Sequence, residues 1–89
     1  MLNNRRSELE IIHHILSLSF EGVRKTKLLY QVNLNHRQLN IYIEYLIDKN
    51  ILIKKELETD SGKSYSIFEI SKKGKELIDN IGRIFEILE

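Results

Sequence analysis

Basic and amide side chains gather in the middle of the chain with a spacing that suits an anionic polymer. Arg24, Lys25 and Lys27 fall within four residues, and Arg37 and Asn40 follow, three positions apart from each other. Guanidinium and ammonium groups bind phosphate oxygens, and Arg can also pair with guanine as Asn can with adenine. These residue types indicate a surface that contacts nucleic acid at its backbone and at base edges.

The segment that carries Arg37 and Asn40 is predicted to be an amphipathic helix. It begins at the N-cap Asn35, with Gln38 three residues later, and ends at Lys49 or Asn50. Its inward stripe consists of Leu39, Tyr42, Ile43, Leu46 and Ile47. A rotation of about 100° per residue then turns outward Arg37, Ile41, Glu44 and Asp48, with Asn40 and Tyr45 on the flanks.

Two helices are predicted before this one. The first spans 7–19 and starts with Ser7 and Glu10 in the spacing of a capping box. Its apolar face is predicted to hold Leu9, Ile12, Ile15, Leu16 and Ser19. A short extended connection at Val23 and Arg24 leads to a second helix that starts at Thr26 and turns inward Leu28, Leu29 and Val32.

A β-hairpin is predicted after the third helix. Ile51 to Glu58 and Tyr65 to Ile70 read as two strands, and the polar segment between them contains Gly62, which a tight loop needs. Alternation puts on one side of the first strand Ile51, Ile53 and Leu57, and on the other Lys54, Glu56 and Glu58. Such a hairpin beside a helix-turn-helix is called a wing.

The final helix is predicted to start after the cap residue Ser71 and to carry a heptad seam. The seam consists of Leu77, Ile81, Ile84 and Leu88, with Ile78 and Phe85 beside it. We expect it to form a coiled coil with a second copy of the chain. One domain, 1–89, is therefore expected: a flexible basic arm over 1–6 with Arg5 and Arg6, a body over 7–70 and a dimerisation helix over 71–89.

The chain resembles a known family over about nine tenths of its length, and two segments carry the resemblance. The resemblance rests on TKLLYQVNLNHRQLNIYIEYLIDKNI (26–51) and ISKKGKELI (70–78). The family is that of the archaeal winged-helix proteins typified by the small Sulfolobus ten-kilodalton DNA-binding protein and the related domain of the archaellum regulators. Matching positions are Thr26, Tyr30, Asn33, Leu34, Asn35, Gln38, Leu39, Tyr42, Leu46, Ile51, Lys73 and Gly74. Two positions depart from its pattern: Ser71 replaces a Thr, and Asn50 replaces a Gly.

This resemblance implies an α+β winged helix-turn-helix: three helices, a wing of two to three strands and a C-terminal helix that dimerises as an antiparallel coiled coil. It also implies binding to double-stranded DNA. We expect a transcription regulator or a chromatin-associated protein with its third helix in the major groove and its wing on the backbone. The alternative is a winged helix that contacts only proteins, which the net charge of +1 keeps open.

The residues expected to contact DNA are Arg24, Lys25, Lys27, His36, Arg37, Gln38, Asn40, Ile41, Tyr45, Lys54, Lys55 and Lys63. The residues expected to form the dimer are Leu77, Ile81, Ile84, Phe85 and Leu88. For each basic residue alone, a solvated surface charge is the competing interpretation. Tyr30, Tyr42 and Tyr65 are expected to be core or rim aromatics.

Charge and composition narrow the remaining classes of function. Residues 1–75 carry 13 Lys or Arg and 9 Asp or Glu, whereas residues 76–89 carry 1 Arg and 4 acids, so the basic body is distinct from an acidic last helix. Cysteine is absent, and the adjacent His13 and His14 diverge on a helix, so no metal set is visible. We expect no enzyme, no cofactor, no small-molecule ligand and no membrane span. Cytoplasmic, nucleoid-associated localisation is expected.

Overall fold

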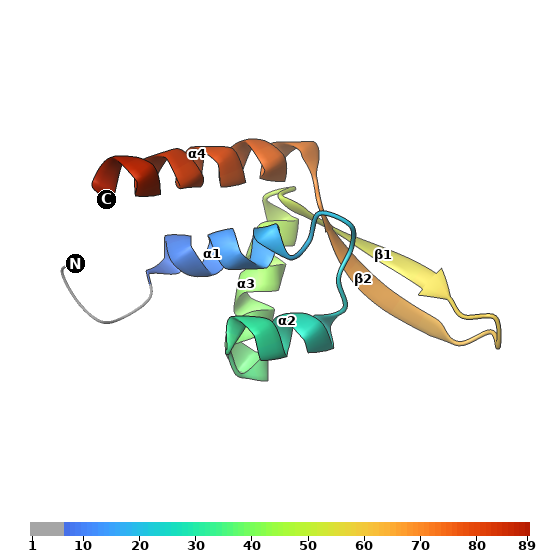
Figure 1. The fold of residues 1–89 in the computed structure, drawn as a ribbon. Helices are drawn as coiled ribbons and strands as arrows, with labels where there is room; N and C mark the ends of the chain where they lie inside the picture. Colours follow the sequence, from blue (N-terminus) through green and yellow to red (C-terminus); the bar gives the residue numbers. More distant parts are fainter. Residues whose placement is uncertain (1–6) are drawn as a thin grey trace.

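The computed structural model describes residues 7–89, in which four helices surround the base of a two-stranded antiparallel sheet (Figure 1). The arm predicted over 1–6, with Arg5 and Arg6, lies outside the described residues. The elements are α1 (Glu8–Ser17), α2 (Lys25–Val32), α3 (His36–Asp48), β1 (Leu52–Glu58), β2 (Ser64–Ile70) and α4 (Lys72–Leu88). This order is the one expected for a winged helix followed by a C-terminal helix.

Local capping signals set the starts of α1 and α3. Ser7 accepts a hydrogen bond from the backbone N–H of Glu10 at 3.1 Å, and Asn35 accepts one from Gln38 at 2.8 Å, so both predicted capping boxes are present. Asn33 and Asn50 have φ of 59° and 61°, the left-handed conformation that Asn tolerates and that ends α2 and α3. The predicted start of α3 after the cap residue Asn35 is confirmed, and the helix ends at Asp48, one residue before the predicted Lys49. Helix α1 ends two residues early, and α2 begins at Lys25 instead of Thr26.

The core lies where α1, α2 and α3 meet the base of the sheet. Leu28, Val32, Leu39 and Leu46 are fully buried, which confirms the inward stripes predicted for α2 and α3. On α1 the prediction was partly wrong, because Ile11 is buried and Leu9 is 42% exposed. Leu9 lines the open groove between the start of α1 and the end of α4, outside the core.

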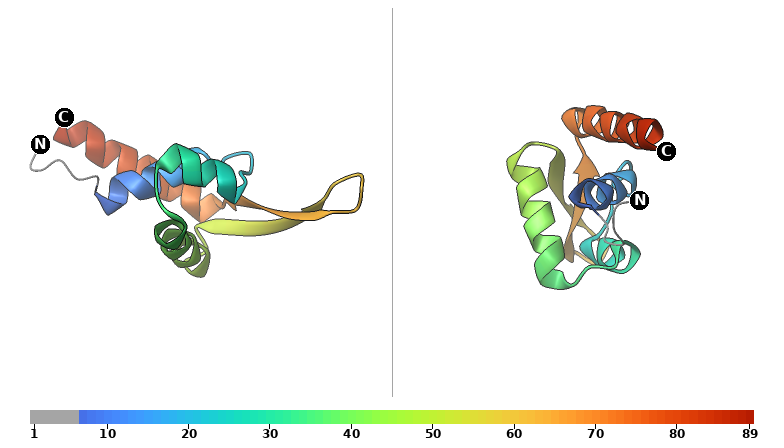
Figure 2. Two further views of the ribbon diagram at one scale, coloured as in Figure 1. Left: turned by 90° about the horizontal axis from the view of Figure 1, so that it is seen from below. Right: turned by 90° about the vertical axis from the view of Figure 1, so that its left-hand side faces the viewer.

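The hairpin β1–β2, which we call the wing, projects away from the helices (Figures 1 and 2). Its loop contains Gly62 at φ +83°, as predicted. The buried residue of β1 is Leu52, whereas Ile53 and Leu57 are 44% and 38% exposed. Ile51 lies in the corner after α3, so the core-facing side of β1 starts at Leu52. Alternation along β1 puts Lys54 and Glu56 on the same side as Leu52 and opposite Ile53 and Leu57, as predicted, and it is the side with Leu52 that continues from the core.

A single bridge extends the sheet beyond two strands. Val23 exchanges two backbone hydrogen bonds with Phe68, at 2.9 and 2.8 Å, in the connection between α1 and α2. The wing predicted with two to three strands is thus a two-stranded sheet plus this one bridge. The bridge holds the start of α2 against β2.

The first turn of α4 is packed against the corner between α3 and β1. Ser71 caps α4 by accepting a hydrogen bond from the N–H of Gly74, and its hydroxyl also lies 2.6 Å from the Asn50 carbonyl oxygen. Lys73 donates to the Lys49 carbonyl at 2.8 Å, which places its charge at the negative end of α3. A Cβ built on Gly74 would overlap the carbonyl oxygen of Ile51. The Lys73-Gly74 pair therefore has a structural role at this corner.

Replacement of Gly74 by Ala should destabilise the fold. The added methyl group meets a backbone oxygen that cannot turn aside, and overpacking of this kind costs about 1 to 3 kcal/mol, more than the ~0.5 to 1 kcal/mol that Ala gains over Gly in a helix. Gly82 of α4 is the matched control, because a Cβ there meets nothing within 4 Å. Denaturant unfolding should show Gly74→Ala less stable and Gly82→Ala slightly more stable. Equal shifts in the same direction would contradict this packing.

Candidate nucleic-acid interface

The outer face of α3 is fixed by its buried stripe. Leu39, Ile43 and Leu46 pack into the core, so Arg37 and Ile41 point away from it. The Ile41 side chain is 60% exposed. His36, at the start of the helix, is also exposed, as are Glu44 and Asp48 further along. An exposed Ile among polar side chains has no role in the core and suits contact with an apolar group such as a thymine methyl.

The side chains of Gln38 and Asn40 do not simply point outward from α3. The Gln38 side-chain oxygen accepts a hydrogen bond from the backbone N–H of Asn35 at 3.2 Å, which completes the cap. Pairing with adenine through both ends of the Gln38 amide would require this bond to break. Asn40 is partly buried and turns toward the wing. Of the two amides, Asn40 is therefore the better placed to read a base.

A hollow of about 270 Å³ separates α3 from the wing. We call it the notch; its lining is formed by Lys25, Asn40, Ile43, Glu44, Ile47, Lys54, Ser66 and Phe68. Three elements thus meet there: the start of α2, the middle of α3 and the core-facing side of the wing. Among the residues predicted to contact DNA, the notch brings together Lys25, Asn40 and Lys54.

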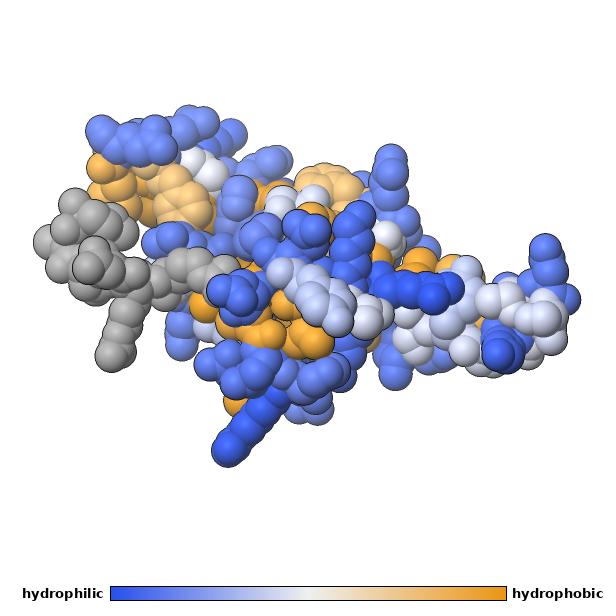
Figure 3. Space-filling view, turned by 60° about the horizontal axis from the view of Figure 1, so that its bottom comes forward, coloured by the Kyte–Doolittle hydropathy of each residue, from blue (hydrophilic) through white to orange (hydrophobic). Residues whose placement is uncertain are grey.

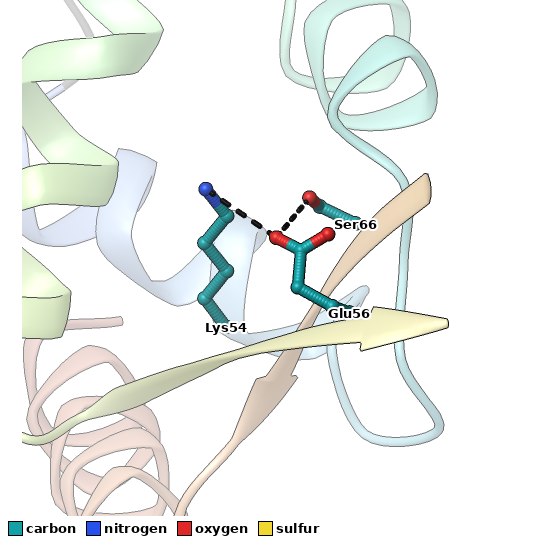
Figure 4. Close-up of polar contacts among 3 residues, drawn as sticks. All are labelled: Lys54, Glu56 and Ser66. Atoms are coloured by element: carbon teal, nitrogen blue, oxygen red, sulfur yellow. Dashed lines mark hydrogen bonds and ion pairs between the residues drawn. The ribbon is translucent and has the colours of Figure 1, made fainter. Parts of the chain in front are cut away.

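Lys54 forms an exposed ion pair with an acidic residue of the wing. Figure 4 shows Lys54 and Glu56 rising from β1 on the same side as Ser66 of β2. The Lys54 ammonium lies 3.7 Å from a Glu56 carboxylate oxygen, and the Ser66 hydroxyl donates to that oxygen at 2.8 Å. Both charged side chains are more than half exposed, and such pairs contribute about 0 to 1 kcal/mol. Lys54 can therefore exchange this partner for a phosphate at little cost.

The start of α2 carries three cations without a compensating acid. Arg24 is the N-cap residue, makes no side-chain cap, and is followed by Lys25 and Lys27 in a first turn that contains no Asp or Glu. Lys27 is exposed and Lys25 partly buried. The Arg24 guanidinium lies over the ring of Tyr65, with its central carbon 4.1 Å from the ring centroid. This end of α2 is strongly positive, since the helix dipole adds to the three side chains.

The remaining predicted cations of the wing are separated. Lys55 lies on the opposite side of the wing from Lys54 and donates to a Glu69 carboxylate oxygen at 2.6 Å. The structure thus does not place Lys55 with the notch residues. Lys63 is exposed in the loop at the tip of the wing. The cations that line the notch are Lys25 of α2 and Lys54 of the wing, whereas Arg24 lies over Tyr65 on the side of the wing that carries Lys55.

The sequence analysis placed some exposed residues correctly and missed or misjudged others. Tyr30, expected in the core or rim, is 79% exposed on α2. Tyr45 is 52% exposed as predicted, and the Lys49 ammonium lies 5.8 Å from its ring centroid. Glu56 carried no signal beyond its alternation in the strand. The contact of Arg24 with Tyr65 joins residues far apart in the sequence, and no local pattern announces it.

A second feature lies at the far end of the molecule, between α1 and the end of α4. Of the predicted dimer residues, Ile81 is buried in the chain itself and Leu77 packs against the core, whereas Ile84 and Leu88 are 43% and 77% exposed. Phe85 is partly buried and packs against His13, with ring centroids 5.6 Å apart. An open groove of about 730 Å³ is lined chiefly by Leu9, His13, Ile84, Phe85 and Leu88. Figure 3 shows apolar surface at this end of the molecule.

Among residues 7–89, no group of three or more His, Cys, Asp and Glu side chains could hold a metal ion. None of the described helices combines the length and apolar character that crossing a membrane requires.

Comparison with known proteins points to one family. A family model described as winged helix-turn-helix matches residues 5–89. An uncharacterized protein of Methanocaldococcus jannaschii is 36% identical over 85 residues, which cover 94% of this chain and 78% of that protein. A second uncharacterized protein of the same organism is 28% identical over 94% of this chain but only 36% of its own length.

Two solved structures share the fold. Sso10a-2, a DNA-binding protein from Sulfolobus solfataricus, superposes with a TM-score of 0.75 at 24% identity, covering 92% of this chain and 81% of that one. A possible transcriptional regulator from Methanosarcina mazei Go1 superposes with a TM-score of 0.60 at 21% identity, covering 96% and 72% of the two chains. The order of helices and strands described above is therefore shared with both.

Proposed function

This chain belongs to the winged helix-turn-helix family, and we propose that it is a homodimeric protein that binds double-stranded DNA, as a transcription regulator or a chromatin-associated factor. The observation that carries the proposal is the surface formed by the outer side of α3, the notch and the cationic start of α2. Arg37, Asn40 and Ile41 offer groups for base edges, whereas Lys25, Lys27 and Lys54 offer cations for the backbone on either side. The printed descriptions of the two solved relatives, a DNA-binding protein and a possible transcriptional regulator, support this proposal.

In the proposed complex, the first two turns of α3 enter the major groove. Arg37 is then the candidate for guanine, Asn40 for adenine and Ile41 for a thymine methyl. Glu44 borders the notch and Asp48 lies near the end of α3, so the second half of α3 should stay clear of phosphates. Lys63 at the wing tip and the cations of α2 would contact the backbone on the two sides of this groove.

The main rival is a winged helix that binds only proteins. The net charge of +1 and the acids Glu44 and Glu56 near the notch favour it. The cations at the start of α2 favour DNA instead, because no ion pair among the described residues includes Arg24, Lys25 or Lys27. Salt dependence separates the two interpretations.

Binding to duplex DNA should weaken steeply with salt. If the dimer neutralises roughly 6 phosphates, its affinity should fall about a thousandfold between about 50 and 200 mM salt. Fluorescence anisotropy with random and genomic duplexes across a salt series measures this slope and also reports any preferred sequence. The absence of binding at the lowest salt would rule out the DNA proposal and favour the protein-contact alternative.

Substitutions on α3 test whether the helix reads bases. Arg37→Ala and Asn40→Ala should each cost about 1 to 3 kcal/mol on a preferred duplex with little effect on folding, because neither side chain belongs to the buried stripe. Arg83→Ala is the control, since it removes the same charge from an exposed position on α4. Equal losses on every duplex would instead mean that α3 touches only the backbone, and the function would then be architectural.

The dimer is proposed to form through the end of α4. Ile84 and Leu88 are exposed beside the groove, Leu9 adds apolar surface from α1, and Ile87, outside the predicted seam, is 82% exposed. About 1.5 to 3 kcal/mol for each apolar side chain is set against an association cost of about 4 to 15 kcal/mol. Burial of three apolar side chains per chain is therefore only marginally sufficient for a stable dimer. Additional burial of Leu9 and Ile87 would make the dimer more stable. A two-fold axis with antiparallel helices would bury the same patch on both chains.

The double change Ile84→Glu, Leu88→Glu should give a folded protein that is mostly monomeric. It should also bind DNA much more weakly, because two linked half-sites become one. Ile53→Glu, at an apolar position of the wing that is exposed to the same degree as Ile84, is the control and should remain dimeric. Analytical ultracentrifugation measures the oligomeric state of the double variant and of the control. Sedimentation of the unmodified protein as a monomer at tens of micromolar would contradict the dimer.

A further inference from the structure

The contact between Arg24 and Tyr65 joins the start of α2 to the wing, on the side of the wing that carries Lys55 and not on the side of the notch. Arg24 precedes α2, whereas Tyr65 is the second residue of β2. The guanidinium carbon lies 4.1 Å from the ring centroid, well within the ~6 Å range of a cation–π contact. The start of α2 and the wing are thus linked by a side-chain contact as well as by the backbone.

The backbone near Arg24 is held firmly against β2. Val23 is bound to Phe68 by two hydrogen bonds, and Gly22 lies so close to Ile67 that a Cβ at Gly22 would come within 2.7 Å of that side chain. Arg24 therefore leaves the sheet from a defined point. Its long side chain would still be free to sample many rotamers in water, and the Tyr65 ring selects one direction among them.

The charge of Arg24 is not consumed by this contact. The two ion pairs found among residues 7–89 involve Lys54 with Glu56 and Lys55 with Glu69, and neither includes Arg24. A guanidinium carries five N–H donors, and a contact of its central carbon with a ring face leaves donors that can bind a phosphate with two parallel hydrogen bonds. Arg24 is thus an exposed, oriented cation without a carboxylate partner.

We propose that Tyr65 is a positioning residue for DNA binding, whose ring holds the Arg24 guanidinium in the orientation that binds a backbone phosphate. This inference rests on the proposed function, because it assigns Arg24 to the duplex backbone. Tyr65 itself need not touch DNA. Because the ring already restricts the Arg24 side chain in the free protein, less side-chain conformational entropy is lost on binding.

The proposal separates the effect of Tyr65 from that of Arg24. Removal of the ring leaves the charge, so Tyr65→Leu should lower the affinity about two- to fivefold for each stack engaged, the equivalent of a cation–π contact at an exposed site, without changing the salt slope. Arg24→Gln removes the charge and should reduce the slope by about 0.9 per protomer. Tyr65→Phe keeps the ring face and should bind like the unmodified protein.

A double-mutant cycle with these variants is the test. Anisotropy titrations on one duplex should show that Tyr65→Leu has no further effect when Arg24 is already Gln. In the free protein, the NMR signal of the Arg24 Nε–H should move in Tyr65→Leu and stay in place in Tyr65→Phe, because the ring current is lost only in the first. Thermal unfolding by circular dichroism confirms that each variant is folded.

Three results would overturn the proposal. Additive effects of the two substitutions would mean that Tyr65 acts independently of Arg24, and a loss in Tyr65→Phe equal to that in Tyr65→Leu would assign the effect to the hydroxyl. Both results leave DNA binding itself intact. Failure of the unmodified protein to bind any duplex at low salt would overturn this inference together with the proposed function.

Discussion

The arrangement of the molecule depends on one close contact, where the first turn of α4 rests on the corner between α3 and β1. The Ser71 hydroxyl reaches the carbonyls of Asn50 and Ile51, Lys73 reaches that of Lys49, and Gly74 leaves room for the Ile51 oxygen. Three elements with different proposed tasks therefore diverge from a single point: α3 toward DNA, the wing beside it and α4 toward a second chain. The same corner ends α3, because the backbone N–H groups of Lys49, Asn50 and Ile51 donate to the last carbonyls of that helix.

The candidate interface carries few cations without a nearby acid, so the position of each cation matters more than their number. Glu56 accompanies Lys54, Glu69 neutralises Lys55, and Glu44 borders the notch. The start of α2 is the exception, since Arg24, Lys25 and Lys27 have no acid in the first turn. A surface of this kind attracts a polyanion at a few defined places, so its affinity should depend on how well those places match the spacing of phosphates and half-sites.

Much of the fold could be predicted because its determinants are local. The capping boxes at Ser7 and Asn35 and the loop glycine Gly62 are read from neighbouring residues, and the structure confirms them. Alternation separates the two sides of β1 correctly, but it does not tell which side faces the core, because Ile51 at the corner and Leu52 are both buried. At the site, the exposed positions of α3 follow from its stripe, whereas the stack of Arg24 on Tyr65 depends on how the α1–α2 connection is bound to β2, a long-range pairing without a sequence pattern.

The central claim is that one continuous surface, formed by the first half of α3, the start of α2 and the wing, binds duplex DNA. Titration of the isotope-labelled protein with a duplex, followed residue by residue through its backbone amide NMR signals, tests it most directly. The account predicts that the largest changes fall on the first two turns of α3, at Arg24 to Lys27 and on the wing, with α1 little affected. Changes confined to the groove between α1 and α4, or none at all, would contradict it.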